Sequence, residues 1–393
     1  MLFTTSLENL GMRAYAFIVI ALIGAALVLH QETKFFTVEG CLREASEQQL
    51  TCLRTAISRP AEFGNLSRSF DALAQAYELD PTFADSCHGN THELGKSAYG
   101  VHHGGKEIRL SEKASYCGFG FFHGFMEELL AVTNDITEAR DFCRKLGGDY
   151  EGGKGESACY HGFGHGAMDG SDPGIYGDPV KLVQPALEIC ALVGDSVAHK
   201  NLCASGVFNS LAIYFSNKKF GLIPDERNPY GPCAFFTEDY ERRACYDQMN
   251  TFVLGLTRNV LAPALALATV IEDPLYAASA VEGLTTFYAS FHKHDAATTF
   301  EAVAADCHAL PNYLREACLK GYGGGLAEFG MPKEEYVHSL AFCQEEVLSD
   351  SEVRSCLNRT IPLLRAIYSN SKFETLCDRE IKPEFRGLYC QSS

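Results

Sequence analysis

The sequence has no excess of basic residues, and this absence excludes nucleic acid as its main partner. It contains 33 Lys and Arg against 50 Asp and Glu, which gives a net charge of −17, whereas binding to a phosphate backbone needs clustered positive charge. The chain also lacks the polar composition of a disordered protein. Of its 393 residues, 46% are hydrophobic and 21% are charged, so we expect a folded protein with a large core.

Several motifs of catalysis and cofactor binding are absent as well. The sequence has no G-x-x-x-x-G-K-[ST] phosphate loop, no C-x-x-C pair typical of thiol–disulfide exchange and no C-x-x-C-H haem attachment site. Residues 91–96 (THELGK) begin like the H-E-x-x-H motif of zinc peptidases, but Lys96 stands where the second histidine is required. The sequence therefore offers no ready-made nucleotide, haem, thiol-redox or zinc-peptidase site.

Long apolar runs are scarce, and only one is a candidate membrane span. Residues 14–29 (AYAFIVIALIGAALVL) carry no charge, and with their flanks they approach the roughly 20 residues that a spanning helix needs. The small residues Gly24, Ala25 and Ala26 lie inside the run, and no small-x-small cleavage site follows it. An uncleaved signal anchor is therefore favoured, and a cleaved signal peptide is the alternative.

The anchor predicts the layout of the chain, and the 16 cysteines, which are expected in an oxidising compartment, predict its orientation. We expect a short cytoplasmic tail at residues 1–13, a transmembrane anchor at 14–30, a juxtamembrane segment at 31–66 and an extracytoplasmic domain at 67–393. The protein would then be a single-pass membrane protein that contacts the membrane through residues 14–30, with its bulk in the periplasm or the extracellular space.

Cysteine, by contrast, is abundant, with 16 residues in an even count. Such a number needs a metal or redox explanation in a reducing cytosol and indicates disulfides outside it. From residue 143 onward the cysteines form close consecutive pairs. These pairs are Cys143 and Cys159, Cys190 and Cys203, Cys233 and Cys245, Cys307 and Cys318, Cys343 and Cys356, and Cys377 and Cys390. The first four, Cys41, Cys52, Cys87 and Cys117, permit three pairings, among which we prefer the consecutive one.

The second cysteine of each pair marks a repeat of about forty residues. The motif C-x-x-G-x-x-x-small follows it in CGFGFFHG (117–124), CYHGFGHG (159–166), CASGVFNS (203–210) and CLKGYGGG (318–325). On a helix, the cysteine and both small residues share one stripe, against which a neighbouring helix can pack closely. The interval from Cys245 to Cys318 spans about two repeats, and within it residues 264–291 keep Ala280 and Gly283 at the positions of the motif's cysteine and first glycine. This indicates a repeat without cysteines.

These patterns predict an all-α fold in which about eight disulfide-closed helical hairpins stack as a solenoid. Such stacked hairpins resemble tetratricopeptide-type repeats, particularly their secreted, cysteine-rich variants. One local match is ALAQAYELDP (72–81), which fits the end of such a repeat. The period is longer than the usual 34 residues and the recurring motif is different. The resemblance therefore implies an architecture and no functional residue.

Histidines gather in the first repeats, where seven of the 13 lie between residues 88 and 165. Two histidines four residues apart on one helical face can hold a divalent ion, and a neighbouring helix can supply a third ligand. The candidate ligands are His88, His92, His123, His161 and His165, with Glu127 or Asp169 as carboxylate ligands and His102 and His103 at the edge. The expected ion is a divalent transition metal, namely zinc, iron, copper or manganese.

Later repeats carry Asn209, Thr251 and Gly324 at the position of His123 and His165. Packing of the helices therefore does not require histidine there. This contrast divides the domain into His-bearing repeats at 67–170 and repeats without a His column at 171–393.

Three functions remain open. The favoured one is a metal-binding or interaction module. The second is a metal-dependent hydrolase or oxidoreductase at the same histidines, which are also similar to the histidine boxes of membrane di-iron hydroxylases and desaturases. The third is a scaffold whose histidines only pack and whose surface holds a protein or peptide partner. An open coordination position beside a deep pocket would favour the enzyme.

Overall fold

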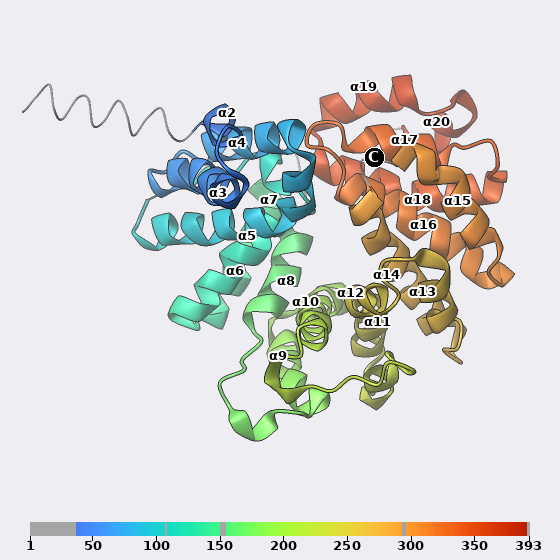
Figure 1. The fold of residues 1–393 in the computed structure, drawn as a ribbon, viewed down its shortest axis with the longest axis horizontal. Coiled ribbons are helices and arrows are strands. Elements are labelled where there is room, and N and C mark those ends of the chain that lie inside the picture. The colour runs from blue at the N-terminus through green and yellow to red at the C-terminus, as the bar shows by residue number, and fades with distance from the viewer. Residues whose placement is uncertain (1–36, 107, 150–154, 293–295, 391–393) are drawn as a thin grey trace, which may run out of the picture.

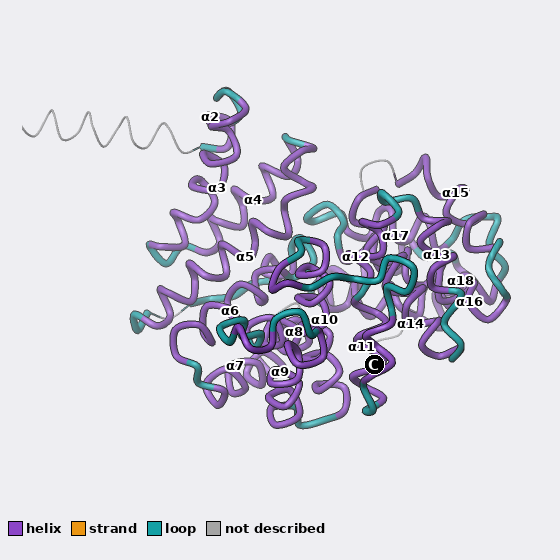
Figure 2. The backbone as a smooth tube through the Cα atoms, turned by 60° about the horizontal axis from the view of Figure 1, so that its bottom comes forward, coloured by secondary structure: helices purple, strands orange, loops and turns teal. Residues whose placement is uncertain are grey.

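The computed structural model describes residues 37–106, 108–149, 155–292 and 296–390, and within these ranges it contains helices and no strands (Figures 1 and 2). The all-helical prediction is thus confirmed for the described chain. The predicted tail and anchor, at 1–13 and 14–30, lie outside the described residues. Among the helices of the described ranges, none is long and apolar enough to cross a membrane.

The helices follow one another with short connections. The first part comprises α2 (Val38–Cys41), α3 (Ser46–Glu62), α4 (Leu66–Leu79), α5 (Pro81–His103), η1 (Glu112–Ser115), α6 (Gly120–Thr133), α7 (Ile136–Asp149) and α8 (Gly155–Gly166). The middle comprises η2 (Pro173–Ile175), α9 (Pro179–Val193), α10 (Val197–Ser216), η3 (Lys219–Gly221), η4 (Gly231–Phe235), α11 (Asp239–Gln248), α12 (Asn250–Leu256), α13 (Leu261–Ala268) and α14 (Pro274–His292). The last part comprises α15 (Ala296–His308), α16 (Asn312–Glu328), α17 (Glu335–Cys343), α18 (Asp350–Ile367), α19 (Asn370–Glu380) and α20 (Pro383–Tyr389).

The helical array begins earlier than the expected boundary at residue 67. Helices α2 and α3 lie within the segment predicted as juxtamembrane, and α3 packs against α4 and α5. Polar caps fix several helix starts, because side-chain oxygens accept the free N–H groups of the first turn. Asn65 caps α4 in this way, and Asp178 caps α9, which opens with a proline.

Eight disulfides close the hairpins, and all join cysteines that are consecutive in the sequence. The pairs are Cys41–Cys52, Cys87–Cys117, Cys143–Cys159, Cys190–Cys203, Cys233–Cys245, Cys307–Cys318, Cys343–Cys356 and Cys377–Cys390. Cys190 near the end of α9 and Cys203 in α10 show the geometry, with Cα atoms 5.5 Å apart. The first four cysteines follow the preferred consecutive pairing.

One helix of each repeat forms the inner layer of a curved array. Helices α5, α6, α8, α10, α11, α14, α16 and α18 contact one another in that order (Figure 1). Helices α7, α9, α13, α15 and α17 each pack against the inner helix that follows them. The hairpins therefore stack side by side, and the inner helices share one concave surface.

The small-residue stripe lies where neighbouring inner helices meet. A Cβ atom on Gly124 of α6 would lie 1.9 Å from the backbone oxygen of His92, and one on Gly206 of α10 would lie 1.9 Å from that of His161. In the repeat without cysteines, a Cβ on Gly283 would lie 2.1 Å from the backbone oxygen of Asp247. Glycine is required at these positions because the helices approach backbone to backbone, as the motif predicts.

The array curves until its last repeats meet its first (Figure 1). The hydroxyl of Tyr77 donates to the backbone oxygen of Phe329 at 3.4 Å, and the ring of Phe329 lies 6.0 Å from that of His88. Helix α18 also contacts η1. The inner helices thereby surround a central cavity of 1510 Å³, into which the histidines of the first repeats project.

Candidate metal centre

Equivalent positions of successive repeats line the central cavity. Two residues after the second cysteine of a pair, or after Ala280 in the repeat without cysteines, lie His161, Ser205, Asp247, Glu282, Lys320 and Asn358. Six residues after it lie His123, His165, Asn209, Thr251 and Thr286. The chemistry of the wall therefore changes along the array, from imidazoles on α5, α6 and α8 to amides, carboxylates and cations on the later helices.

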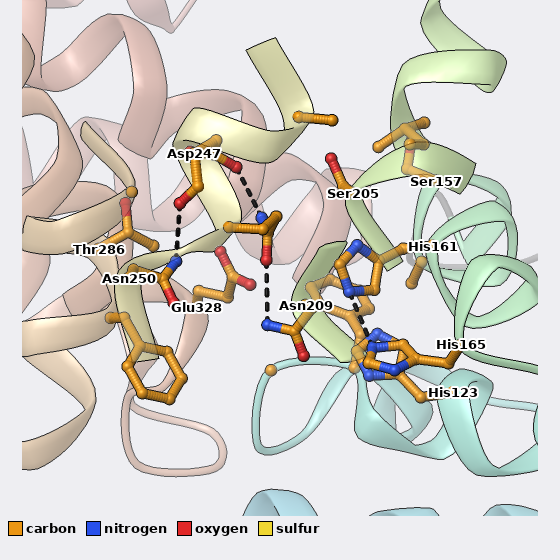
Figure 3. Close-up of a pocket in the computed structure, with 18 of the residues that line it drawn as sticks. His123, Ser157, His161, His165, Ser205, Asn209, Asp247, Asn250, Thr286 and Glu328 are labelled. Carbon is orange, nitrogen blue, oxygen red and sulfur yellow. Dashed lines mark hydrogen bonds between the residues drawn. The ribbon is translucent and has the colours of Figure 1, made fainter. Parts of the chain in front are cut away.

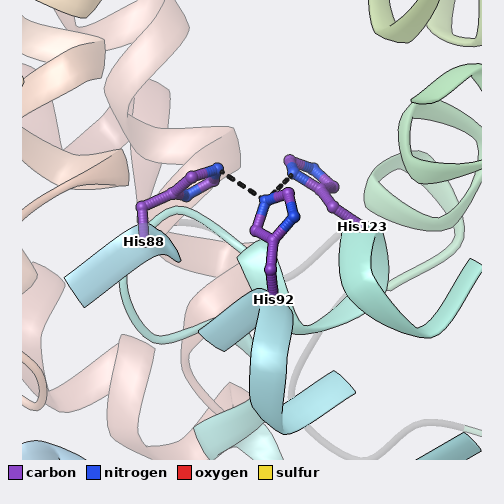
Figure 4. A group of neighbouring side chains, drawn as sticks. All are labelled: His88, His92 and His123. Atoms are coloured by element: carbon purple, nitrogen blue, oxygen red, sulfur yellow. Dashed lines mark hydrogen bonds between the residues drawn. The ribbon is translucent and has the colours of Figure 1, made fainter. Parts of the chain in front are cut away.

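His88 and His92 of α5 and His123 of α6 form a first triad (Figure 4). Their ligand nitrogens all lie within 4.8 Å of one another. The Nε2 atoms of His88 and His92 are 3.2 Å apart, and Nε2 of His92 lies 3.3 Å from Nδ1 of His123. On a tetrahedral ion with metal–nitrogen bonds of about 2.0–2.1 Å, two ligand nitrogens lie roughly 3.3 Å apart. The triad therefore has the spacing of a metal site.

The other nitrogens of α5's histidines fix their tautomers. His88 donates from Nδ1 to the backbone oxygen of Cys117 at 2.7 Å, and His92 donates from Nδ1 to Oε1 of Glu127 at 3.1 Å. A carbonyl and a carboxylate accept but do not donate, so each neutral ring presents an Nε2 lone pair to the other. Two lone pairs at this distance repel each other, whereas a metal cation between them is held by both.

An unusual backbone turn places the carbonyl that holds His88. Cys117, Gly118 and Phe119 have φ values of 57°, 70° and 61°, all in the left-handed region. Non-glycine residues rarely adopt this conformation, and strain of this kind gathers at functional sites. Here the turn directs the Cys117 carbonyl onto His88 just before α6 begins.

Glu127 lies behind His92 and orients it. Burial alone would raise the pKa of Glu127, but the hydrogen bond from His92 and the charge of Lys96, whose Nζ lies 3.5 Å from Oε2, hold that pKa below its usual range. The carboxylate is thus ionised at neutral pH. A carboxylate behind a histidine ligand fixes the ring's tautomer and orientation, and this is the place of Glu127 in the structure.

His123 of α6 joins His161 and His165 of α8 in a second triad, again within 4.8 Å (Figure 3). The Nε2 atoms of His161 and His165 are 3.2 Å apart, and Nδ1 of His165 lies 2.9 Å from Oγ of Ser210. Burial and the neighbouring histidines lower the pKa of His123 and His165 well below the usual value. Burial and His92 lower the pKa of His161 to about 4. Neutral imidazole is the form that binds metals.

Three of the residues expected at the site lie elsewhere. Helix α8 ends at Gly166, so Asp169 does not continue the line of His165; it is exposed in the following turn, where Ser171 donates to it. His102 packs against Phe125 and Phe142, and His103 stacks on Tyr99. Ten residues of helix place His102 about 15 Å along the axis from His92.

The opposite wall carries a cluster of charges that sequence reasoning missed. Nζ of Lys320 lies 2.9 Å from Glu282, and the Arg359 guanidinium lies 3.9 Å from Glu282 and 3.8 Å from Glu328. Burial and the charge of Glu282 raise the pKa of Asp247 to about 7. The sequence could have indicated this cluster, because Asp247, Glu282 and Lys320 share the repeat position of His161.

A hydrogen-bonded chain reaches from the second triad's neighbourhood toward this wall. Asn209 occupies the repeat position that His123 and His165 hold in the earlier repeats. It donates to Gln248 at 3.0 Å, and Gln248 donates to Asp247 at 2.6 Å (Figure 3). Polar side chains thus link Asn209 of α10 to Asp247 of α11 along the cavity wall.

No protein-family model, curated protein or solved structure matches this chain. The function is therefore argued from the site itself, which consists of histidine triads on the wall of a large cavity.

Proposed function

We propose that this chain is an extracytoplasmic metal-binding protein that holds a divalent transition metal through the histidines of its first three repeats. Residues 14–30 would anchor it in a membrane, and its stacked hairpins would form a solenoid that curves back on itself. Of the ions considered, zinc, copper and iron suit an all-imidazole donor set better than manganese does.

The contact between Nε2 of His88 and Nε2 of His92 carries the proposal. Hydrogen bonds to Cys117 and Glu127 occupy both Nδ1 atoms, so the Nε2 lone pairs of the two neutral rings face each other at a separation that fits a metal ion. Histidines that served only for packing would place a donor opposite an acceptor.

The cysteines support an oxidising compartment. No free cysteine occurs in the described ranges, and all 16 are in disulfides, an arrangement that persists outside the reducing cytosol. A protein or peptide partner on repeats 171–393 is a further part of the proposal, to be sought by binding experiments.

Metal content per chain tests the proposal. The full chain, purified without a polyhistidine tag, is stripped with chelator and reconstituted separately with zinc, copper, iron and manganese before elemental analysis. We expect stoichiometric metal in the wild type and none in a variant with alanine at His88, His92, His161 and His165. The matched control carries His102→Ala and His103→Ala, on α5 but away from the triads, and should bind like the wild type. Equal metal in the control and the fourfold variant, or none in the wild type, would overturn the proposal.

A metal-dependent hydrolase is the second candidate, and the cavity favours it. Each triad supplies three protein ligands, the number typical of catalytic zinc, and the cavity of 1510 Å³ leaves room for water and substrate. Asp247, with its pKa raised to about 7, could exchange a proton near neutral pH. Metal-dependent cleavage of chromogenic esters or phosphates that falls in Asp247→Asn, but not in the exposed control Asp378→Asn, would support this function. Absence of turnover would leave the binding protein.

A further inference from the structure

His123 lies between two pairs of histidines. Its helix α6 contacts α5 on one side and α8 on the other, so His88 and His92 flank it from one direction and His161 and His165 from the other. The His123 ring centroid lies 5.1 Å from those of His88, His92 and His165 and 4.7 Å from that of His161. His123 is buried, with 6% of the residue exposed.

The five histidines do not form a single shell. Their ligand nitrogens fall into two triads that share only His123. An imidazole has nitrogens on two edges of its ring, and each nitrogen binds one ion. Nδ1 of His123 lies 3.3 Å from Nε2 of His92, which assigns Nδ1 to the first triad and leaves Nε2 for the second.

The surroundings of His123 differ from those of three of the other ligands. His88 is held by a carbonyl, His92 by a carboxylate and His165 by a hydroxyl, each through Nδ1. Neither His123 nor His161 has such a partner among the described residues; their hydrogen-bond contacts are to His92 and to His165. Nδ1 of His123 faces another imidazole, and among the described histidines His123 alone belongs to both triads.

We propose that the cluster is a binuclear centre in which His123 bridges two metal ions as an imidazolate. One ion binds Nε2 of His88, Nε2 of His92 and Nδ1 of His123. The other binds His161, His165 and Nε2 of His123. As the second ion binds, the ring N–H proton of His123 passes to solvent, so that each ring nitrogen carries one metal bond. This inference rests on the proposed function and specifies the number of ions and their connection.

Copper(II) is a suitable probe, because an imidazolate bridge couples two copper spins. The stripped full chain is titrated with copper and studied by electron paramagnetic resonance. We expect two coppers per wild-type chain, with a signal well below that of two isolated ions. Variants with alanine at His88 and His92, or at His161 and His165, should each keep one copper with the full signal of an isolated ion. The His102→Ala, His103→Ala control should match the wild type.

The outcomes separate this inference from the proposed function. One copper per wild-type chain, lost in both pair variants, would indicate a single site and overturn the bridge while keeping metal binding. Two coppers with full, uncoupled signal would also overturn the bridge. No copper in the wild type would overturn both. The wild-type measurement alone decides the bridge even where a variant fails to fold.

Discussion

His92 shows how single side chains build the site. Its Nδ1 donates to Glu127, and its Nε2 faces His88 and His123. One ring is therefore oriented from behind by a carboxylate and presents its free nitrogen to the cavity. The affinity of the first triad should depend on the charge of a residue that does not touch the ion.

We expect Glu127→Gln to lower the affinity of the first triad by about 10- to 100-fold, the usual effect of losing a partner behind a metal ligand. The amide can still accept from His92 but no longer carries the negative charge. Competition with a chelator of known affinity measures the change. Glu93→Gln is the control, because Glu93 is exposed, lies on α5 and also pairs with Lys96. Similar affinities for both variants would argue against this role of Glu127.

The lowered pKa values of the histidines predict an acid-sensitive metal-free protein. Below pH 6.5 the unfolded chain binds protons at positions where the folded chain does not, since the folded pKa of His161 is about 4 and those of His123 and His165 are also lowered. Stability contributed by these groups is present above pH 6.5 and falls as the pH drops toward 4.

Urea unfolding at pH 7, 6 and 5 in metal-free buffer tests whether the free energy of unfolding falls as the pH drops. Burial raises the pKa values of Asp247 and Glu335 to about 7, so these carboxyl groups stabilise the folded chain as the pH drops. A variant at His161 therefore isolates the contribution of that histidine to the pH dependence. We expect the loss of stability on acidification to be smaller in His161→Asn than in the wild type. Parallel pH profiles would show that His161 titrates normally in the folded chain.

At the scale of helices, the small-residue stripe sets the distance between repeats. Gly89 and Gly124 form a matched pair on the two helices of the first triad. A Cβ on Gly124 would lie 1.9 Å from the backbone of His92, whereas one on Gly89 of α5 would meet nothing within 4 Å.

We expect Gly124→Ala to destabilise the protein by about 1–3 kcal/mol, because α5 and α6 must separate. His92 moves with α5, so copper affinity at the first triad should fall as well. Gly89→Ala should instead leave stability unchanged or raise it by up to about 1 kcal/mol, since alanine favours the helix. Unfolding and metal titration measure both effects. A similar loss of stability in both variants would show that helix propensity, and not close packing, governs this stripe.

The periodic part of the sequence predicted the elements well. The spacing of the cysteines indicated the helical hairpins and their bridges, and the stripe at Ala280 and Gly283 indicated the repeat without cysteines. Predictions that depended on where a helix ends were less successful. Asp169 was placed on the line of His165, but α8 stops at Gly166 within a turn rich in glycine. The segment 31–66, expected to be juxtamembrane, contains helices α2 and α3.

At the scale of the molecule, closure of the array could not be predicted from sequence. Curvature accumulates from small rotations between repeats, and these depend on how each helix pair packs. Closure brings Phe329, at the end of α16, to His88 of α5 and brings α18 to η1, and it encloses the cavity that the histidines line. The register of the repeats did place Asp247, Glu282 and Lys320 in the column of His161, but only the closed array shows that they face one cavity.

Phe329 holds this closure at the point where the last repeats meet the first site. Its backbone oxygen accepts from Tyr77, and its ring packs beside His88 and against Gly118, where a Cβ would lie 2.6 Å from the ring. The ring therefore fills the space between the two ends of the array and also borders the first triad. Loss of the ring should weaken both the contact between the two ends of the array and the packing around the first triad.

We expect Phe329→Ala to destabilise the protein by about 1–3 kcal/mol, less than for a fully buried phenylalanine, because the ring is partly exposed. The contact between the last and the first repeats should open, so small-angle X-ray scattering should give a larger radius of gyration. Copper affinity should fall at the first triad, beside His88, and hold at the second. Phe235→Ala, at a ring that is 71% exposed, is the control and should change neither scattering nor affinity. Unchanged scattering in Phe329→Ala, with lowered affinity, would mean that other contacts close the array and that the ring acts on His88 alone.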